Sequence, residues 1–126
     1  MASPTDCLYT DSHEWFRKDG DIVTVGITQY AANELTDITY VEMKSPGTSI
    51  QAGESVGEVE SVKTTSDVYS AFSGEVVEIN DAAAGDPSIL NQDPYDAGWL
   101  VKIRFEGDAQ SDLLDPATYD SKYPLD

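Results

Sequence analysis

Residues 57–70 read GEVESVKTTSDVYS, and the remaining elements of the chain are arranged around this stretch. Both halves are rich in Val, Thr and Ser, and they read as short strands. A single lysine, Lys63, stands between the two halves, although the chain has few lysines. The pattern therefore predicts a β-hairpin with Lys63 near its turn, although no Asn-Gly or Gly-Gly pair marks the tip.

The residues before this hairpin also favour short elements. Residues 18–21, Lys-Asp-Gly-Asp, are a strong turn signal between runs 11–17 and 22–27, and they predict a second hairpin. Thr28 is expected to cap a short helix over residues 29–35, where alanine is favourable and the apolar spacing fits. Residues 37–43 return to strand, with Ile38, Tyr40 and Glu42 expected on one face.

The second half of the chain continues this pattern. Residues 74–80 alternate as a half-buried strand does, and residues 91–98 read as a loop. The clearest last strand covers residues 99–105, with one apolar face formed by Trp99, Val101, Ile103 and Phe105. Two short helices are predicted over residues 109–114 and 116–121, the second capped by Asp115 with Pro116 at its first position.

Many short strands with few helical residues predict a mainly β fold, a sandwich or flattened barrel with small peripheral helices. A chain of 126 residues is long enough for one core, and no composition break divides it, so we expect a single domain over residues 1–126. No apolar run is long enough to span a bilayer, and residues 1–6 lack the regions of a signal peptide. We therefore expect a soluble, cytoplasmic protein.

The composition is strongly acidic, with 24 Asp and Glu against 7 Lys and Arg and a net charge of −17. Because nucleic acids and anionic membranes are bound through Lys and Arg, we expect neither as a partner. The acids are dispersed and aromatic and β-branched residues remain, which argues against disorder. We interpret the charge as a solvated acidic surface adapted to a salty cytoplasm, where salt screens self-repulsion.

Little in the sequence suggests catalysis. His13 is the only histidine, and no Ser or Cys nucleophile motif accompanies it, so we expect a hydrogen-bonded structural residue and no catalytic triad. The single cysteine, Cys7, excludes an intrachain disulfide and is expected to serve in packing. Calcium loops, phosphate loops and Cys-x-x-Cys pairs are missing from the sequence. One reactive lysine without acid–base machinery fits a carrier better than an enzyme, although spacing alone also allows Lys63 to be an ordinary solvated turn residue.

The motifs around the lysine resemble the lipoylation segment of the glycine cleavage system H-protein family. They are Glu60-Ser61-Val62-Lys63, Ser66-Asp67 and Ser73-Gly74-Glu75-Val76. The resemblance implies lipoate in amide linkage on Lys63, and a pattern read by lipoate-attaching enzymes that includes Glu60 and Gly74. It covers nearly the whole chain, since residues 12–15 and 91–95 also match family motifs. Thr36 departs from the family, because a glycine is usual there.

The same resemblance implies a lipoyl-domain-like hybrid of flattened barrel and sandwich, and a non-catalytic shuttle. The arm would take the aminomethyl group of glycine from a pyridoxal-phosphate-dependent glycine decarboxylase, the P protein, to a tetrahydrofolate-dependent aminomethyltransferase, the T protein. A flavin-containing dihydrolipoyl dehydrogenase, the L protein, would then reoxidise it. Family members shelter the loaded arm from water. Ser12, Glu14 and Asp67 are the candidates to contact the amine, the alternative being an exposed Glu14 that contributes nothing.

Three other interpretations stay open. A biotin carrier domain also displays a lysine on a hairpin, but that lysine normally lies between methionines, whereas Val62 and Thr64 flank Lys63. A related protein could donate lipoyl groups to other lipoate-dependent complexes, and the sequence does not separate this role from glycine cleavage. The third alternative is a small acidic scaffold without any modification.

Overall fold

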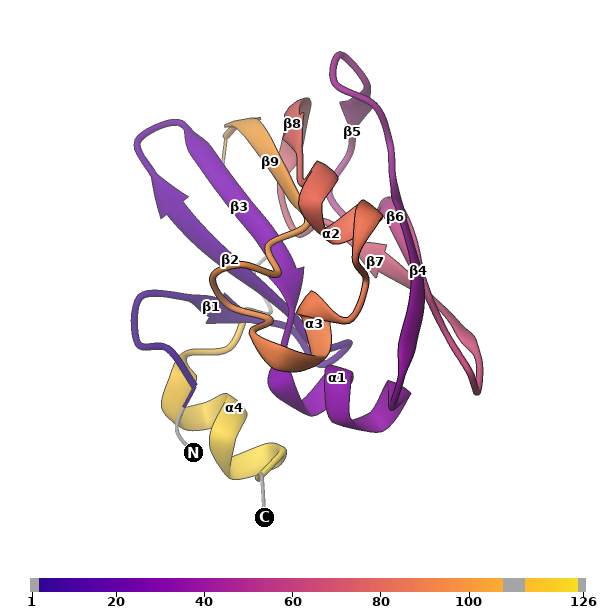
Figure 1. Ribbon diagram of the computed structural model, residues 1–126. Coiled ribbons are helices and arrows are strands. Elements are labelled where there is room, and N and C mark those ends of the chain that lie inside the picture. Colours follow the sequence, from indigo (N-terminus) through magenta and orange to yellow (C-terminus); the bar gives the residue numbers. More distant parts are fainter. Residues whose placement is uncertain (1–2, 108–112, 125–126) are drawn as a thin grey trace.

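The computed structural model describes residues 3–107 and 113–124, and in these residues nine strands form two antiparallel sheets (Figure 1). The larger sheet has the order β1 (Leu8–Tyr9), β2 (Glu14–Asp19), β3 (Ile22–Ile27), β9 (Val101–Glu106), β8 (Ser73–Ile79) and β5 (Ser49–Ile50). The smaller sheet has the order β4 (Ile38–Met43), β6 (Ser55–Ser61) and β7 (Thr65–Tyr69). The predicted mainly β fold is confirmed, and the described strands form two open sheets instead of a closed barrel.

Four short helices lie around the sheets in the described part of the chain. They are α1 (Gln29–Leu35), α2 (Asp81–Gly85), α3 (Ile89–Gln92) and α4 (Pro116–Lys122). The predicted caps are confirmed: Thr28 accepts from the Ala31 amide, and Asp115 accepts from the Thr118 amide. None of the helices in residues 3–107 and 113–124 combines the length and the apolar character that crossing a bilayer requires.

The helix expected over residues 109–114 lies largely outside the described residues. Its last residue, Leu114, is not helical and pairs with Tyr9 of β1 through two backbone hydrogen bonds of 2.7 and 2.8 Å. The loop expected over residues 91–98 begins two residues later, because residues 91 and 92 still belong to α3.

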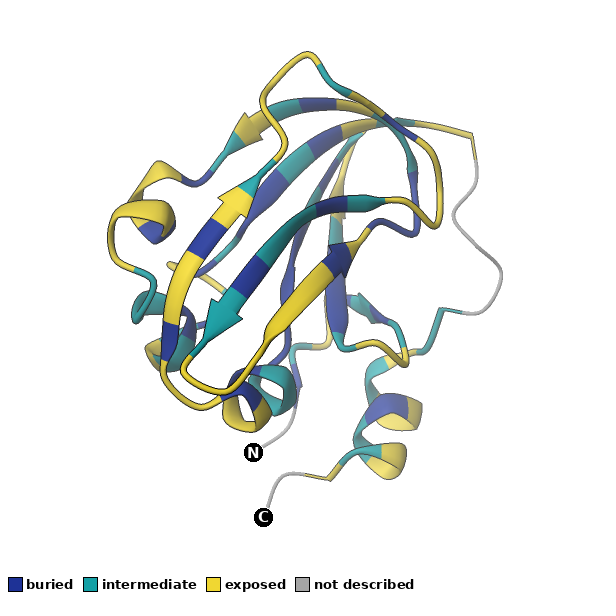
Figure 2. Cartoon of the chain, turned by 90° about the vertical axis from the view of Figure 1, so that its right-hand side faces the viewer, coloured by how far each residue is buried: buried dark blue, intermediate teal, exposed yellow. Residues whose placement is uncertain are grey.

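Side chains from the inward faces of both sheets form the main core. This arrangement follows from strand alternation, which sends every second side chain toward the facing sheet. The small sheet shows its outer face in Figure 2, where single buried positions are separated by exposed or partly exposed ones along the strands. Core residues from the two sheets include Val25, Val41, Val59, Val76 and Ile103.

Two details of the strand predictions are wrong. A register shift between Ile38 and Tyr40 places their side chains on different faces, so Ile38 is buried whereas Tyr40 is 42% exposed and not part of the core. The last strand starts at Val101 instead of Trp99. Trp99 packs against a second group of aromatic residues, because a turn closed by its amide and the Asp96 carbonyl precedes the strand.

This second group, the aromatic cluster, consists of Cys7, Tyr9, Trp15 and Tyr119. It fixes α4 against β1, at the end of the molecule away from the β6–β7 hairpin (Figure 1). Tyr9 and Tyr119 stack with ring centroids 4.8 Å apart. His13 Nδ1 lies 2.8 Å from the Tyr119 hydroxyl, so the predicted structural role of the histidine is confirmed. Cys7 is buried in this cluster as expected, and burial raises the pKa of its thiol to about 11.

Candidate functional site

Lys63 lies in the turn of the β6–β7 hairpin, as the sequence predicts, and its side chain is exposed. Ser61 shapes this turn. Its amide donates to the Thr64 carbonyl at 2.8 Å, and its Oγ accepts from the amides of Lys63 and Thr64 at 3.1 and 3.2 Å. A serine hydroxyl that bonds backbone amides stabilises a tight turn without Asn-Gly, which explains why that signal is missing.

The tip of the hairpin carries its neighbours outward as well, since Val62 is 66% exposed. The Lys63 ammonium nitrogen donates to the carbonyl oxygen of Glu34 at 3.3 Å, in the last turn of α1. A buried nitrogen would have removed the carrier hypothesis. The observed amine is accessible to a modifying enzyme and lies beside a helix end.

Glu60 and Gly74, the other two residues of the predicted modification pattern, lie in different sheets. Glu60 is on β6, opposite Tyr40 on one side and Thr65 on the other. Gly74 is on β8, where a Cβ atom would overlap the backbone of Arg104 on β9. Close approach of two strands therefore requires glycine at this position, which is a local structural reason for the residue.

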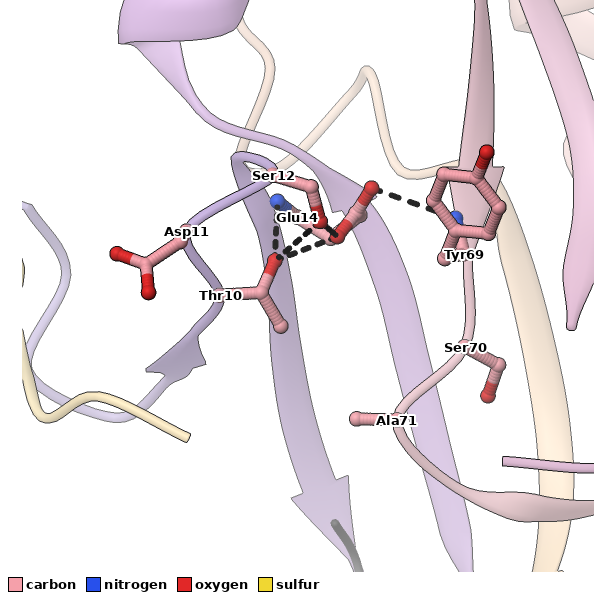
Figure 3. A pocket seen from close by; sticks show the side chains of 7 residues that line it. All are labelled: Thr10, Asp11, Ser12, Glu14, Tyr69, Ser70 and Ala71. Atoms are coloured by element: carbon pink, nitrogen blue, oxygen red, sulfur yellow. Dashed lines mark hydrogen bonds between the residues drawn. The ribbon is translucent and has the colours of Figure 1, made fainter. Parts of the chain in front are cut away.

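Glu14, the first residue of β2, is only 1% exposed and lies at the centre of a hydrogen-bond network (Figure 3). Its Oε1 accepts from the hydroxyls of Ser12 and Thr10, each at 2.5 Å. Its Oε2 accepts from the amide of Tyr69, the last residue of β7, at 3.3 Å. Burial raises the pKa of Glu14, and the hydrogen bonds from Ser12 and Thr10 oppose that rise. The alternative of an exposed Glu14 is wrong.

Two cavities meet at this carboxylate, since Ser12 and Glu14 line both of them. The first has a volume of about 340 Å³ and is the open space drawn in Figure 3. In that view the hydroxyls of Thr10 and Ser12 point toward Glu14, whereas the Asp11 carboxylate points away. Asp11 instead pairs with Lys122 at 2.7 Å. The remaining lining residues of the first cavity are Tyr69, Ser70 and Ala71.

The second cavity, of about 130 Å³, lies between α1 and β7. Its walls are largely apolar and are formed by Ile27, Ala31, Leu35, Val59 and Val68. Glu34 lines one part of it and supplies the carbonyl that holds Lys63, while Ser12 and Glu14 line another part. The exposed lysine therefore contacts one residue of the cavity, Glu34, and the buried Glu14 lines the same cavity.

The three predicted shelter residues all line this second cavity, but they are not equivalent. Ser12 and Glu14 are hydrogen-bonded to each other. Asp67 is exposed on β7, opposite Glu58, and its carboxylate accepts from the Tyr69 hydroxyl at 3.4 Å. Asp67 therefore lines the cavity, but its carboxylate is hydrogen-bonded to Tyr69 and does not belong to the hydrogen-bond network of Ser12 and Glu14.

Sequence reasoning missed Thr10, whose hydroxyl donates to Glu14 and accepts from the Glu14 amide at 3.1 Å. A threonine four residues before a glutamate is no signal by itself, because only the tight turn between β1 and β2 brings the two side chains together. In the described residues, no three His, Cys, Asp or Glu side chains are arranged to hold a metal ion.

A family model described as glycine cleavage H-protein matches residues 7–123. The chain belongs to this family. The glycine cleavage system H protein of Rubrobacter xylanophilus is 48% identical over 116 residues, covering 92% of this chain and 90% of the relative. That of Deinococcus deserti is 46% identical over 122 residues, covering 97% and 98%.

A solved structure supports the family assignment at the level of the fold. The crystal structure of a glycine cleavage system H protein from Mycobacterium marinum superimposes with a TM-score of 0.89 at 41% identity, covering 98% of this chain and all of that one. Family membership makes this protein a non-catalytic carrier component of the glycine cleavage system, and the predicted fold and carrier role are confirmed.

Proposed function

We propose that Lys63 carries a lipoyl group in amide linkage, and that this arm moves the aminomethyl group of glycine between the enzymes of the glycine cleavage system. The supporting observation is an exposed lysine at a hairpin tip, beside an apolar cavity that leads to a buried carboxylate. Its partners would be glycine decarboxylase, the aminomethyltransferase, dihydrolipoyl dehydrogenase and the lipoate-attaching enzymes. When bound, lipoate supplies the sulfur that accepts the group, and the protein supplies placement.

The residues of the second cavity fit such a group. Its aliphatic walls suit part of a hydrocarbon stem, and the bond from Lys63 Nζ to the carbonyl of Glu34, a lining residue, supports an attachment point next to the cavity. The cavity is small, about 130 Å³, so the rest of the arm would lie across the surface toward Ser12 and Glu14. Both of these side chains also face the larger first cavity.

Ser12, Glu14 and Asp67 are proposed to hold the amine of the loaded arm. A protonated amine next to Glu14 would be attracted by its carboxylate, and this attraction is stronger than in water because Glu14 is buried. Thr10 and Ser12 would keep the carboxylate oriented through their hydroxyls. Packing of the arm against the apolar walls would exclude water, which protects the aminomethyl group from hydrolysis.

The modification pattern is part of the same proposal. Glu60 lies two residues before the turn, so an attaching enzyme that binds the hairpin would contact it together with Lys63. Gly74 would act through the close packing of β8 on β9. We further propose that the 126 residues act as one lipoyl-carrier domain in the cytoplasm, and that the acidic surface is an adaptation to salt.

Lys63→Arg tests the carrier role, because arginine keeps the charge but cannot be lipoylated. We expect the variant to fold and to lose all activity in a reconstituted glycine cleavage system, whereas the matched control Lys18→Arg retains full activity. Intact mass and peptide mapping of protein from the native host should show a lipoyl group on Lys63. A biotinyl group, a bare lysine or an active Lys63→Arg variant would refute the assignment.

A further inference from the structure

The connection between α1 and β4 is held by one side chain from another part of the chain. Asn91, in α3, accepts a hydrogen bond from the Ile38 amide at 3.0 Å and donates to the Thr36 carbonyl at 2.6 Å. A backbone amide can only donate and a carbonyl can only accept, so these two partners fix the orientation of the Asn91 amide. Asn91 also lies 3.5 Å from the Ala32 carbonyl.

The bonds of Asn91 to Ile38 and Thr36, here called the Asn91 clamp, determine what the Glu34 carbonyl can bind. The last carbonyls of a helix have no partner within the helix. If α1 continued, the amide of Ile38, four residues on, would donate to Glu34. Asn91 takes that amide instead, and the chain leaves in a new direction after Thr36, whose φ is +63°. The Glu34 oxygen accepts instead from Lys63 Nζ at 3.3 Å.

We propose that Asn91 is a positioning residue for the arm on Lys63, because it keeps the Glu34 carbonyl open as the anchor for Nζ. The inference rests on the proposed function. Amide formation leaves Nζ with one hydrogen, so the same atom can donate to the same carbonyl after modification. The arm then starts from a fixed point at the second cavity, which Glu34 and Glu14 both line.

The anchor is weaker after modification than before it. The ammonium of an unmodified lysine is attracted by the partial negative charge at the end of α1, and the neutral amide largely loses that attraction. A single neutral hydrogen bond near the surface holds the arm only part of the time. The arm would therefore be directed into the cavity between visits and still be free to leave for a partner.

Hydrogen exchange of the Lys63 side-chain amide tests the anchor without any enzymatic assay. Lipoylated protein labelled with 15N-lysine is compared by NMR with lipoyllysine in an unfolded peptide of residues 57–70. We expect exchange about fivefold slower in the protein, the effect of one exposed hydrogen bond. Asn91→Ala should return the rate to that of the peptide. Asn33→Ala, which removes only a surface bond within α1, should leave it unchanged.

Asn91→Leu completes the series. Leucine fills the space of the amide without hydrogen bonds, so it should abolish protection even where alanine prevents folding. Absence of protection in the wild type, or full protection in a folded Asn91→Leu or Asn91→Ala variant, would each overturn the inference.

The result is independent of the test of the proposed function. A bare Lys63 in the native host refutes the carrier assignment itself. A lipoylated protein that supports glycine cleavage but shows an unprotected amide refutes only the positioning role of Asn91.

Discussion

The aromatic cluster at one end of the molecule and the Lys63 hairpin at the other are stabilised in different ways. Trp15 is fully buried, and its Nε1 donates to the Pro94 carbonyl at 3.0 Å. The Tyr119 hydroxyl lies 2.7 Å from Thr28 Oγ1 and also contacts His13. The hairpin tip has no comparable packing among the described residues: Val62 is two-thirds exposed, and the turn depends on Ser61.

This difference separates two parts of the molecule. The aromatic cluster and the strands packed against it form a rigid frame, and the hairpin tip displays Lys63. Long-range packing of large side chains makes the frame cooperative, whereas a short exposed turn can change its chemistry without disturbing the fold. Glu14 connects the two regions, because it belongs to β2 of the large sheet and accepts from the Tyr69 amide at the end of β7. The carboxylate thus ties the hairpin's sheet to the frame.

The largest effect is expected for Trp15→Ala. Removing a fully buried tryptophan leaves a cavity and an unpaired Pro94 carbonyl, and should cost about 3–5 kcal/mol of unfolding free energy. Val62→Ala at the hairpin tip should change it by less than about 0.5 kcal/mol. Urea unfolding of both variants measures the contrast. Equal losses would mean that the two regions do not differ in their contribution to stability.

Glu14→Gln tests the connection between the regions. The Gln carbonyl can accept from Ser12 and Thr10, but its amide nitrogen cannot accept from Tyr69, and the unpaired Tyr69 amide should cost about 1–3 kcal/mol. The same variant should release the aminomethyl group faster from the loaded arm. An unchanged rate of release would dismiss the shelter role of Glu14.

The cost of Glu14→Gln should depend on pH. Because the folded pKa of Glu14 is raised above the ordinary value of 4.5, the folded state binds the proton more tightly than the unfolded state. Proton binding by Glu14 therefore stabilises the fold. This contribution is fully present below the ordinary pKa and is lost as the pH rises through the folded pKa. Glutamine does not titrate, so the stability of the variant does not fall with pH in this way. The stability difference should therefore narrow from pH 4 upward, and a constant difference would contradict the raised pKa.

The hairpin could be predicted from the sequence because its signals are local. Strand-forming residues on both sides of Lys63 and the hydroxyl of Ser61 act within a few positions. The same holds for the caps Thr28 and Asp115. The face of Tyr40 was mispredicted, because alternation assumes a regular ladder and a one-residue shift in pairing reverses it.

The frame and the surroundings of the site were harder to predict, because they depend on contacts between distant residues. Tyr119 meets His13 across 106 positions, and Asn91 reaches Thr36 across 55. Neither pair leaves a periodic pattern in the sequence. Ser12 and Glu14 were proposed through family resemblance, whereas the burial of Glu14 and the hydroxyl of Thr10 follow only from the packing of the two sheets.

A smaller effect than those of Trp15→Ala and Glu14→Gln is expected for Thr36→Gly, and it has the opposite sign. Thr36 has φ +63° and ψ −134°, a region that glycine adopts freely and a β-branched residue rarely does. Glycine should relieve this strain and stabilise the fold by about 1 kcal/mol, after its larger unfolded-state entropy is subtracted. Thr65→Gly, at an exposed strand position without positive φ, should instead destabilise the fold.

Thermal unfolding of both glycine variants checks these opposite signs, and a loss of stability in Thr36→Gly would contradict the strain. The gain should also depend on Asn91, because Asn91 donates to the Thr36 carbonyl and holds the strained residue in place. In an Asn91→Ala background the connection can relax, so Thr36→Gly should gain less there than in the wild type. Equal gains in both backgrounds would mean that the backbone holds the strain alone, and that the Asn91 clamp does not set the path of the chain beneath Lys63.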